Sequence, residues 1–190
     1  MAVKKIVTGN HPTLRVTSEK ISAVDDSIKS LLQDLIETLD GTGDKGVGLS
    51  ANQIDEKKRI FVARIYENNE VSETYTPAPR HFINPEVIDV SSESNLIVDP
   101  ERKMLEGCLS LPNIYAFVER PHEVTIRFHT METLESGQDP LEERFIHDNA
   151  IVVQHELDHL NGILFTDHAI QQGQTIYEIT DDDEPRVIEI

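Results

Sequence analysis

Apolar residues recur at helical spacing in the segment 25–41, which predicts an amphipathic helix. Its apolar face consists of Ile28, Leu31, Leu32, Leu35, Ile36 and Leu39. Asp25 or Asp26 can cap the first turn, and Gly41 can end the last one. We expect this helix to pack against the core and to take no part in the chemistry.

Shorter apolar and β-branched segments are typical of strands. Three segments have this composition: 59–65, 82–90, which Asn84-Pro85 interrupts, and 123–129, in which Val124, Ile126 and Phe128 alternate with other residues. The polar residues 66–81 predict a surface loop, and residues 135–140 predict the turn of a hairpin. Separate helices and hairpin-like strands favour an α+β fold with antiparallel or mixed sheets over a parallel wound sheet.

A second helix is predicted from about Asp148 to Gly162 and contains the sequence QHELDHL. Residues four apart lie on one face of a helix, so His155 and His159 present two imidazoles that can bind one metal ion. Glu156 lies close to such an ion and can take a proton from water bound there. So short a motif can also arise by chance, but the position of both histidines on the apolar face favours a metal site. We expect the sheets to pack around this helix.

The third ligand of a catalytic metal site has two candidates in this chain. His168 follows the predicted helix closely, whereas Cys108 lies far upstream in EGCLS and is the chain's single cysteine. A thiolate binds Zn²⁺ or Fe²⁺ strongly. A lone cysteine is more commonly a small buried apolar residue, so the residue types alone leave both candidates open.

The segment GVGLSANQ, residues 46–53, contains two glycines and an amide. A dinucleotide-binding loop would follow a strand and carry a third glycine where this chain has Ala51, so that interpretation is excluded. The glycines are better explained by a close approach of the backbone to a substrate. Gln53 could donate to an oxyanion, although by itself it would be interpreted as an ordinary surface amide.

Composition excludes several kinds of partner. The formal charge of −18, without a Lys/Arg cluster, argues against nucleic acid as the main partner and against an anionic membrane. The chain has no apolar run of membrane-spanning length and no secretory signal, and one cysteine suits a reducing cytoplasm. We expect one domain over residues 1–190, ending in an acidic tail at about 180–190.

Three segments together resemble the motifs of the peptide deformylase family: GVGLSANQ, EGCLS and QHELDHLNG, in the family's order. The resemblance extends to HPTLR, INPEV and GILFTDH and covers roughly residues 5–168. It implies a hydrolase that removes the formyl group from N-formylmethionine at the start of new polypeptides and releases formate.

The resemblance also implies roles for particular residues. The metal ligands would be Cys108, His155 and His159, with water in the fourth position, and Glu156 would act as general base and then as acid. Gln53 and the backbone N–H of Leu109 would hold the developing oxyanion. An apolar pocket for methionine would be formed by Val47, Gly48, Ile151 and Val152, with Glu106 at its rim, and Glu106 and Arg120 would form an ion pair that orients the Cys108 strand.

The implied cofactor is one divalent metal ion, Fe²⁺ in the cell, with Zn²⁺, Ni²⁺ or Co²⁺ as substitutes. The implied partners are N-formylmethionyl nascent peptides and the ribosome exit region, with no membrane partner. The implied location is the cytoplasm.

The chain departs from the family's pattern at Ser50, Asn52 and Asp55, which we expect beside the substrate channel. Two alternatives stay open at this point. A zincin-like peptidase would not need Cys108, and an inactive structural metal module would need neither Glu156 nor Gln53.

Overall fold

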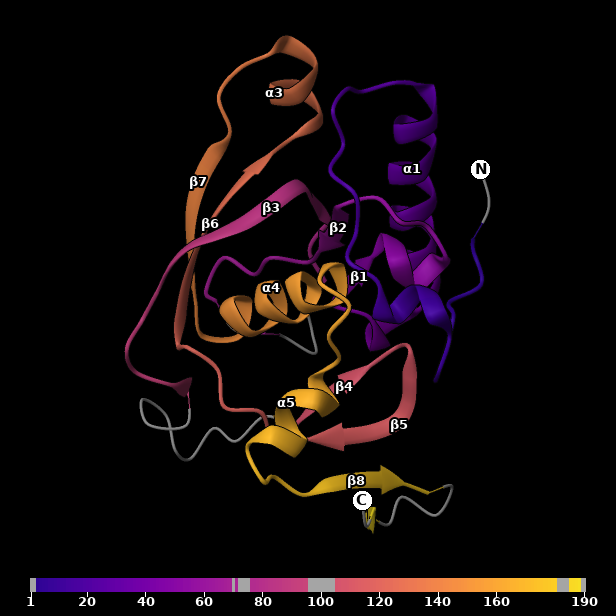
Figure 1. Ribbon diagram of the computed structural model, residues 1–190, viewed down its shortest axis with the longest axis vertical. Coiled ribbons are helices and arrows are strands. Elements are labelled where there is room, and N and C mark those ends of the chain that lie inside the picture. Colours follow the sequence, from indigo (N-terminus) through magenta and orange to yellow (C-terminus); the bar gives the residue numbers. More distant parts are fainter. Residues whose placement is uncertain (1–2, 70, 72–75, 96–104, 181–184, 189–190) are drawn as a thin grey trace.

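A computed structural model describes residues 3–69, 71, 76–95, 105–180 and 185–188 (Figure 1). Two antiparallel sheets form its framework, one of five strands in the order β1-β2-β3-β6-β7 and one of four in the order β4-β5-β8-β9. The first contains β1 (Gly48–Ser50), β2 (Ile60–Ala63), β3 (Arg80–Val90), β6 (Glu123–His129) and β7 (Leu141–Ile146). The second contains β4 (Glu106–Cys108), β5 (Leu111–Ala116), β8 (Ile176–Ile179) and β9 (Pro185–Ile188).

The helices lie around these sheets. They are α1 (Asp26–Gly41), α3 (Met131–Ser136), α4 (His147–Leu160) and α5 (Phe165–Gln171), with short 3-10 turns η1 (Pro12–Arg15), η2 (Gly43–Lys45) and η3 (Ala51–Ile54). Figure 1 shows α4 in the middle of the molecule, with the five-stranded sheet above it and α5 and the four-stranded sheet below. The expected α+β fold around a central helix is confirmed, and both sheets are antiparallel.

Helix α1 begins as its sequence predicts. The Asp25 side chain accepts a hydrogen bond of 2.9 Å from the Ile28 backbone N–H and so caps the first turn. The helix ends at Gly41, as the sequence suggested, and the chain then turns away through Thr42 and Gly43, which has a φ of 63°. The apolar face packs on β2, as expected of a core helix.

Strand β3 continues through Asn84-Pro85, which the sequence suggested as an interruption. Asn84 adopts a φ of 51°, and the pairing with β6 shifts register between Ile83 and Glu86. The Asn84 side chain accepts from the Ile21 N–H at 2.8 Å and donates to the Ile21 carbonyl at 2.7 Å. These two bonds to a distant segment stabilise a bulge where a strand would otherwise end.

Strands β6 and β7 form the expected hairpin, but its connection is partly helical. Helix α3 precedes the turn, and Thr130 caps it by accepting from the Thr133 N–H at 3.2 Å. Gly137 then ends α3 at φ 68°. The predicted loop 66–81 lies partly outside the described residues, and its last two residues, Arg80 and His81, belong to β3.

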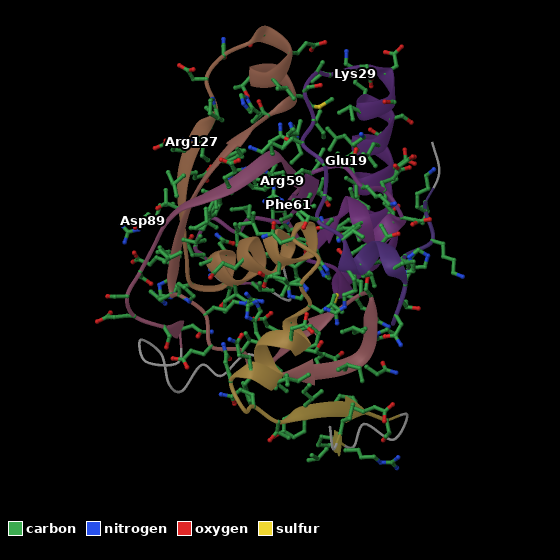
Figure 2. The ribbon with its side chains drawn as sticks, in the orientation of Figure 1. Glu19, Lys29, Arg59, Phe61, Asp89 and Arg127 are labelled. Atoms are coloured by element: carbon green, nitrogen blue, oxygen red, sulfur yellow. The ribbon has the colours of Figure 1, made fainter. Side chains whose placement is uncertain are left out.

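Four aromatic rings form the core between α4 and the five-stranded sheet. Phe61, Phe82, Phe128 and Phe145 are all fully or almost fully buried, and the rings of Phe61 and Phe82 stack with centroids 4.6 Å apart. The apolar face of α4 packs on this cluster through Val153, Leu157 and Leu160. Figure 2 labels Phe61 in the interior next to α4. The core thus sets the distance between α4 and the five-stranded sheet.

Arg59 fixes the end of α4 to the same sheet. Its guanidinium donates to the Pro85 carbonyl through Nε at 3.1 Å and Nη2 at 3.0 Å. Its Nη1 donates to the Leu160 carbonyl at 3.3 Å and to Asn161 Oδ1 at 3.0 Å. The Leu160 carbonyl at the helix end, which also accepts from the Ser18 backbone N–H at 2.8 Å, is thus bonded twice, and α4 is joined to β3.

The tail after residue 180 is partly described. Residues 185–188 form β9, which pairs with β8, so Val187 lies opposite Tyr177 and Ile188 opposite Ile176. The acidic residues 181–184 lie outside the described residues. In the described ranges, no helix is both long and apolar enough to cross a membrane.

We expect Phe82→Ala to lower the free energy of unfolding by about 3–5 kcal/mol, because it opens a cavity in the aromatic cluster that packs against α4. Val87→Ala is the control on the same strand, since Val87 is 49% exposed, and it should change stability by less than about 0.5 kcal/mol. Denaturant unfolding of both variants measures this, and equal losses would contradict the role of the aromatic cluster.

Candidate metal centre and active site

One thiol and two imidazoles meet between α4 and β4. The possible ligand atoms of Cys108, His155 and His159 all lie within 4.8 Å of one another, and Cys108 Sγ is 3.2 Å from His159 Nε2. Helix α4 places the two histidines one turn apart, and β4 supplies the cysteine from its end. One thiolate and two imidazole nitrogens at this spacing fit a single tetrahedral Zn²⁺ or Fe²⁺ ion with a fourth position open.

His168, the alternative third ligand, lies elsewhere. Its Nε2 is 2.9 Å from Asp158 Oδ2, on the side of α4 where Asp158 also accepts from Arg120 Nη1 at 2.8 Å. Among the described residues, the cluster that could hold an ion contains Cys108 and not His168.

A buried ion pair supports the first histidine. Glu106 Oε2 is 3.0 Å from His155 Nδ1 and 2.9 Å from Arg120 Nη2. Both members of the ion pair are buried, with 5% of Glu106 and 4% of Arg120 exposed. Burial disfavours the charged carboxylate, but Arg120 and the bond to His155 prevail and lower the pKa of Glu106 to about 2. A carboxylate on Nδ1 leaves Nε2 of His155 free to face the cluster.

The expected pair of Glu106 and Arg120 is therefore present. Glu106 also lines the cavity of the site, but its two oxygens are engaged by Arg120 and His155. Its carboxylate lies behind His155, buried, and not at an open rim.

Glu156 lies on the side of α4 that faces β1. It is only 3% exposed, and its Oε2 accepts a hydrogen bond of 2.6 Å from Ser50 Oγ. Burial raises the pKa of the Glu156 carboxyl to about 7, although the charge of His155 and the Ser50 hydrogen bond oppose the shift. A carboxyl with a pKa near neutrality can both take and return a proton.

Gln53 is a buried amide at the same site and not a surface one. Its Oε1 accepts from the Ser50 backbone N–H at 2.8 Å. Its Nε2 lies 3.2 Å from Ser110 Oγ and 3.6 Å from Cys108 Sγ. With the oxygen held, the N–H₂ group is turned towards the thiol and hence towards the position of an ion.

An apolar cavity of about 440 Å³ adjoins the cluster. Its lining includes every residue predicted for substrate or oxyanion binding: Val47, Gly48, Gln53, Glu106, Leu109, Ile151 and Val152. It also includes residues that the sequence did not suggest, Leu105, Leu111, Ile114 and Tyr115. No motif marks these four. They lie on β5 and just before β4, and they reach the cavity only when the chain is folded.

Gly46, Gly48 and Gly107 are packed closely within the chain, and Gly48 and Gly107 also line the cavity. A Cβ on Gly48 would lie 2.7 Å from Glu156 Cδ, one on Gly46 would lie 2.8 Å from Leu39 Cδ1, and one on Gly107 would lie 2.6 Å from Tyr115 Cε1. A side chain at any of these positions would therefore force the neighbouring side chain to move.

Ser50, Asn52 and Asp55 do not line the cavity. Ser50 and Asn52 are fully buried and bond to α4, Ser50 at Glu156 and Asn52 at the His159 carbonyl. Asp55 is an exposed residue at φ 65° that accepts a hydrogen bond from Thr13. Ser50 and Asn52 therefore contact α4 and Asp55 contacts the Thr13 segment, and none of the three forms part of the cavity wall.

A Cys-His-His cluster beside a buried carboxylate and an apolar cavity is the arrangement of a metal-dependent hydrolase. Residues 3–175 match the polypeptide deformylase family, and the chain belongs to that family. The resemblance read from the motifs is thereby confirmed. Removal of the formyl group from N-formylmethionyl peptides is the hydrolytic activity of this family, which is metal-dependent.

The relatives span nearly the whole chain. A peptide deformylase of Pseudothermotoga lettingae is 41% identical over 165 residues, 87% of this chain and 82% of the relative. One of Phenylobacterium zucineum is 36% identical over 168 residues, 88% of each chain. The solved structure of a class I type b peptide deformylase from Acinetobacter baumannii bound to Met-Ala-Ser is 26% identical, with a TM-score of 0.72 over 88% of this chain and 98% of that one.

We expect Glu106→Gln to weaken metal binding about 10- to 100-fold, because it removes the charge that orients His155 and leaves Arg120 partly unpaired. Competition with a chelator measures the affinity. Glu143→Gln is the matched control, since Glu143 pairs with Arg80 at 2.8 Å on the exposed surface. Equal metal affinity in the two variants would show that the buried pair does not support the ligand.

Proposed function

We propose that Cys108, His155 and His159 hold one divalent metal ion at which this chain hydrolyses the formyl group of N-formylmethionyl peptides. The observation that carries the proposal is the meeting of these three side chains, within 4.8 Å, beside the buried Glu156. When bound, the ion polarises the formyl carbonyl and makes water a better nucleophile. The ligand set suits Fe²⁺ in the cell, with Zn²⁺, Ni²⁺ or Co²⁺ as substitutes.

Glu156 is proposed to move the proton. It takes a proton from the attacking water as the new C–O bond forms at the formyl carbon. It then gives this proton to the amine nitrogen as the C–N bond breaks, so formate and a free N-terminal methionine leave. The pKa of about 7 supports both steps, because the group is then neither too weak a base nor too weak an acid.

Gln53 and Leu109 are proposed to hold the oxyanion. The bond from the Ser50 N–H to Gln53 Oε1 directs the amide nitrogen towards the Cys108 thiol, where the formyl oxygen would approach. The backbone N–H of Leu109, next to the ligand Cys108, would be the second donor. Donors fixed before the reaction stabilise the developing charge without a cost of reorganisation.

The apolar cavity is proposed to bind the methionine side chain. Val47, Ile151 and Val152 provide an apolar wall next to the cluster, and Gly48 leaves the backbone of β1 exposed to the peptide. The Met-Ala-Ser peptide in the Acinetobacter baumannii enzyme supports a peptide with N-terminal methionine as the occupant. We propose that the substrates are nascent chains met at the ribosome exit region in the cytoplasm, and that residues 1–190 act as one domain.

We expect the purified chain loaded with Fe²⁺, Co²⁺ or Ni²⁺ to release formate from formyl-Met-Ala-Ser. Glu156→Ala should lower the rate by about 10²- to 10⁴-fold, because Glu106, the other carboxylate among the described residues that line the cavity, is bonded to Arg120 and His155. Glu132→Ala, which removes an exposed helix carboxylate, should leave the rate unchanged. The absence of formate with each of the three metals would refute the proposed function.

Cys108→Ser should greatly lower the bound metal, because a serine hydroxyl is a poor replacement for a thiolate. Elemental analysis of the purified variant beside the unmodified chain measures the loss. A zincin-like site would keep its ion through other ligands. Full metal content in Cys108→Ser would therefore favour that alternative over a deformylase centre.

A further inference from the structure

Two residues of β1 face Glu156. Gly48 and Ser50 are two positions apart on the strand, so both are directed to the same side of the sheet, where α4 lies. Ser50 Oγ lies 2.6 Å from Glu156 Oε2 and 3.0 Å from the Glu156 backbone carbonyl. A hydroxyl has one hydrogen, and the shorter, charge-assisted bond to the carboxylate is the stronger of the two.

Gly48 packs against Oε1, the other oxygen of the Glu156 carboxylate. A Cβ at this position would lie 2.7 Å from Glu156 Cδ and would clash with Oε1. The carboxylate therefore rests against the bare backbone of Gly48 on one side and accepts the Ser50 hydroxyl on the other. In the part of the chain that the structure describes, Ser50 is the one side chain with a hydrogen bond to the Glu156 carboxylate.

Ser50 cannot act by touching the substrate. It is fully buried and is not among the residues that line the cavity. Glutamate has several rotatable bonds, and a reacting group displaced by about 1 Å loses much of its effect. A donor that selects one orientation of the carboxylate would therefore act on the rate and not on peptide binding.

We propose that Ser50 is the positioning residue of the general base, holding the Glu156 carboxylate in the orientation needed for proton transfer. This inference rests on the proposed role of Glu156. The backbone N–H of Ser50 holds Gln53 at the same time. Because a substitution leaves that N–H in place, the side chain can be tested without removing the support of the oxyanion donor.

The test compares Ser50→Ala and Ser50→Cys with the unmodified enzyme, each loaded with the same metal. Cysteine nearly keeps the size of serine but is a weak donor. Both variants should lower kcat about 10- to 100-fold with KM within about threefold and unchanged metal content. Ser18→Ala is the matched control, since Ser18 is 6% exposed and its hydroxyl has no partner among the described residues; its kcat should not change.

A crystal structure of Ser50→Ala provides a measurement independent of rate, and the Glu156 carboxylate should be turned away from its present orientation. Wild-type kcat in Ser50→Ala, or wild-type kcat restored by Ser50→Cys, would overturn the inference, as would a loss explained by missing metal. The Glu156→Ala variant distinguishes a failure of the role proposed for Ser50 from a failure of the role proposed for Glu156. If it is inactive while Ser50→Ala is fully active, only the role of Ser50 fails; if it is active, the proposed base fails.

Discussion

The buried pair of Arg120 and Glu106 is the interaction on which the geometry of the site depends. Arg120 bonds Glu106 on β4 and Asp158 on α4, so a single guanidinium joins the two elements that carry the cluster. Burying charges is costly, and a buried ion pair is often no more stabilising than an apolar contact. Breaking one, however, leaves an uncompensated charge and costs about 3–5 kcal/mol. Such a pair therefore tolerates few alternative arrangements of β4 against α4, and a metal centre needs this restriction because bond lengths to an ion vary little.

Different faces of helix α4 contact different parts of the molecule. Val153, Leu157 and Leu160 rest on the aromatic core, His155 and His159 face β4, and Glu156 faces β1. This division explains why almost the whole helix is buried although it carries several polar residues. Several of these polar side chains bond to different neighbours: Glu156 to Ser50, Asp158 to Arg120 and Gln154 to the Pro121 carbonyl. The periodicity of a simple amphipathic helix is consequently weak in α4, whereas α1, which only packs on the core, shows it clearly.

A feature could be predicted from the sequence when the residues that determine it lie close together along the chain. The cap of α1 at Asp25 and the alternation of β6 depend on residues a few positions apart, and the structure has both elements where the patterns predict them. The continuation of β3 through Asn84 depends on Ile21, and no local pattern reveals that bond. The combined motifs predicted the family correctly. The close packing of Gly48 against Glu156 could not be predicted, because Glu156 lies more than a hundred positions away along the chain. The roles of the site residues stay predictions.

A His-Glu-x-x-His helix does not define a reaction by itself. It supplies two ligands and a carboxylate, and these serve the hydrolysis of many amides. The proposed third ligand comes from β4 and the proposed amide donor from the turn after β1, and these two strands are at the edges of their sheets. An edge strand has unpaired backbone groups on one side, which a peptide can use. The cluster and cavity thus lie where two sheet edges approach one helix. Backbone that the proposed peptide substrate would use lies there beside the Cys-His-His cluster, and the charges of Glu106 and Arg120 behind that cluster are buried.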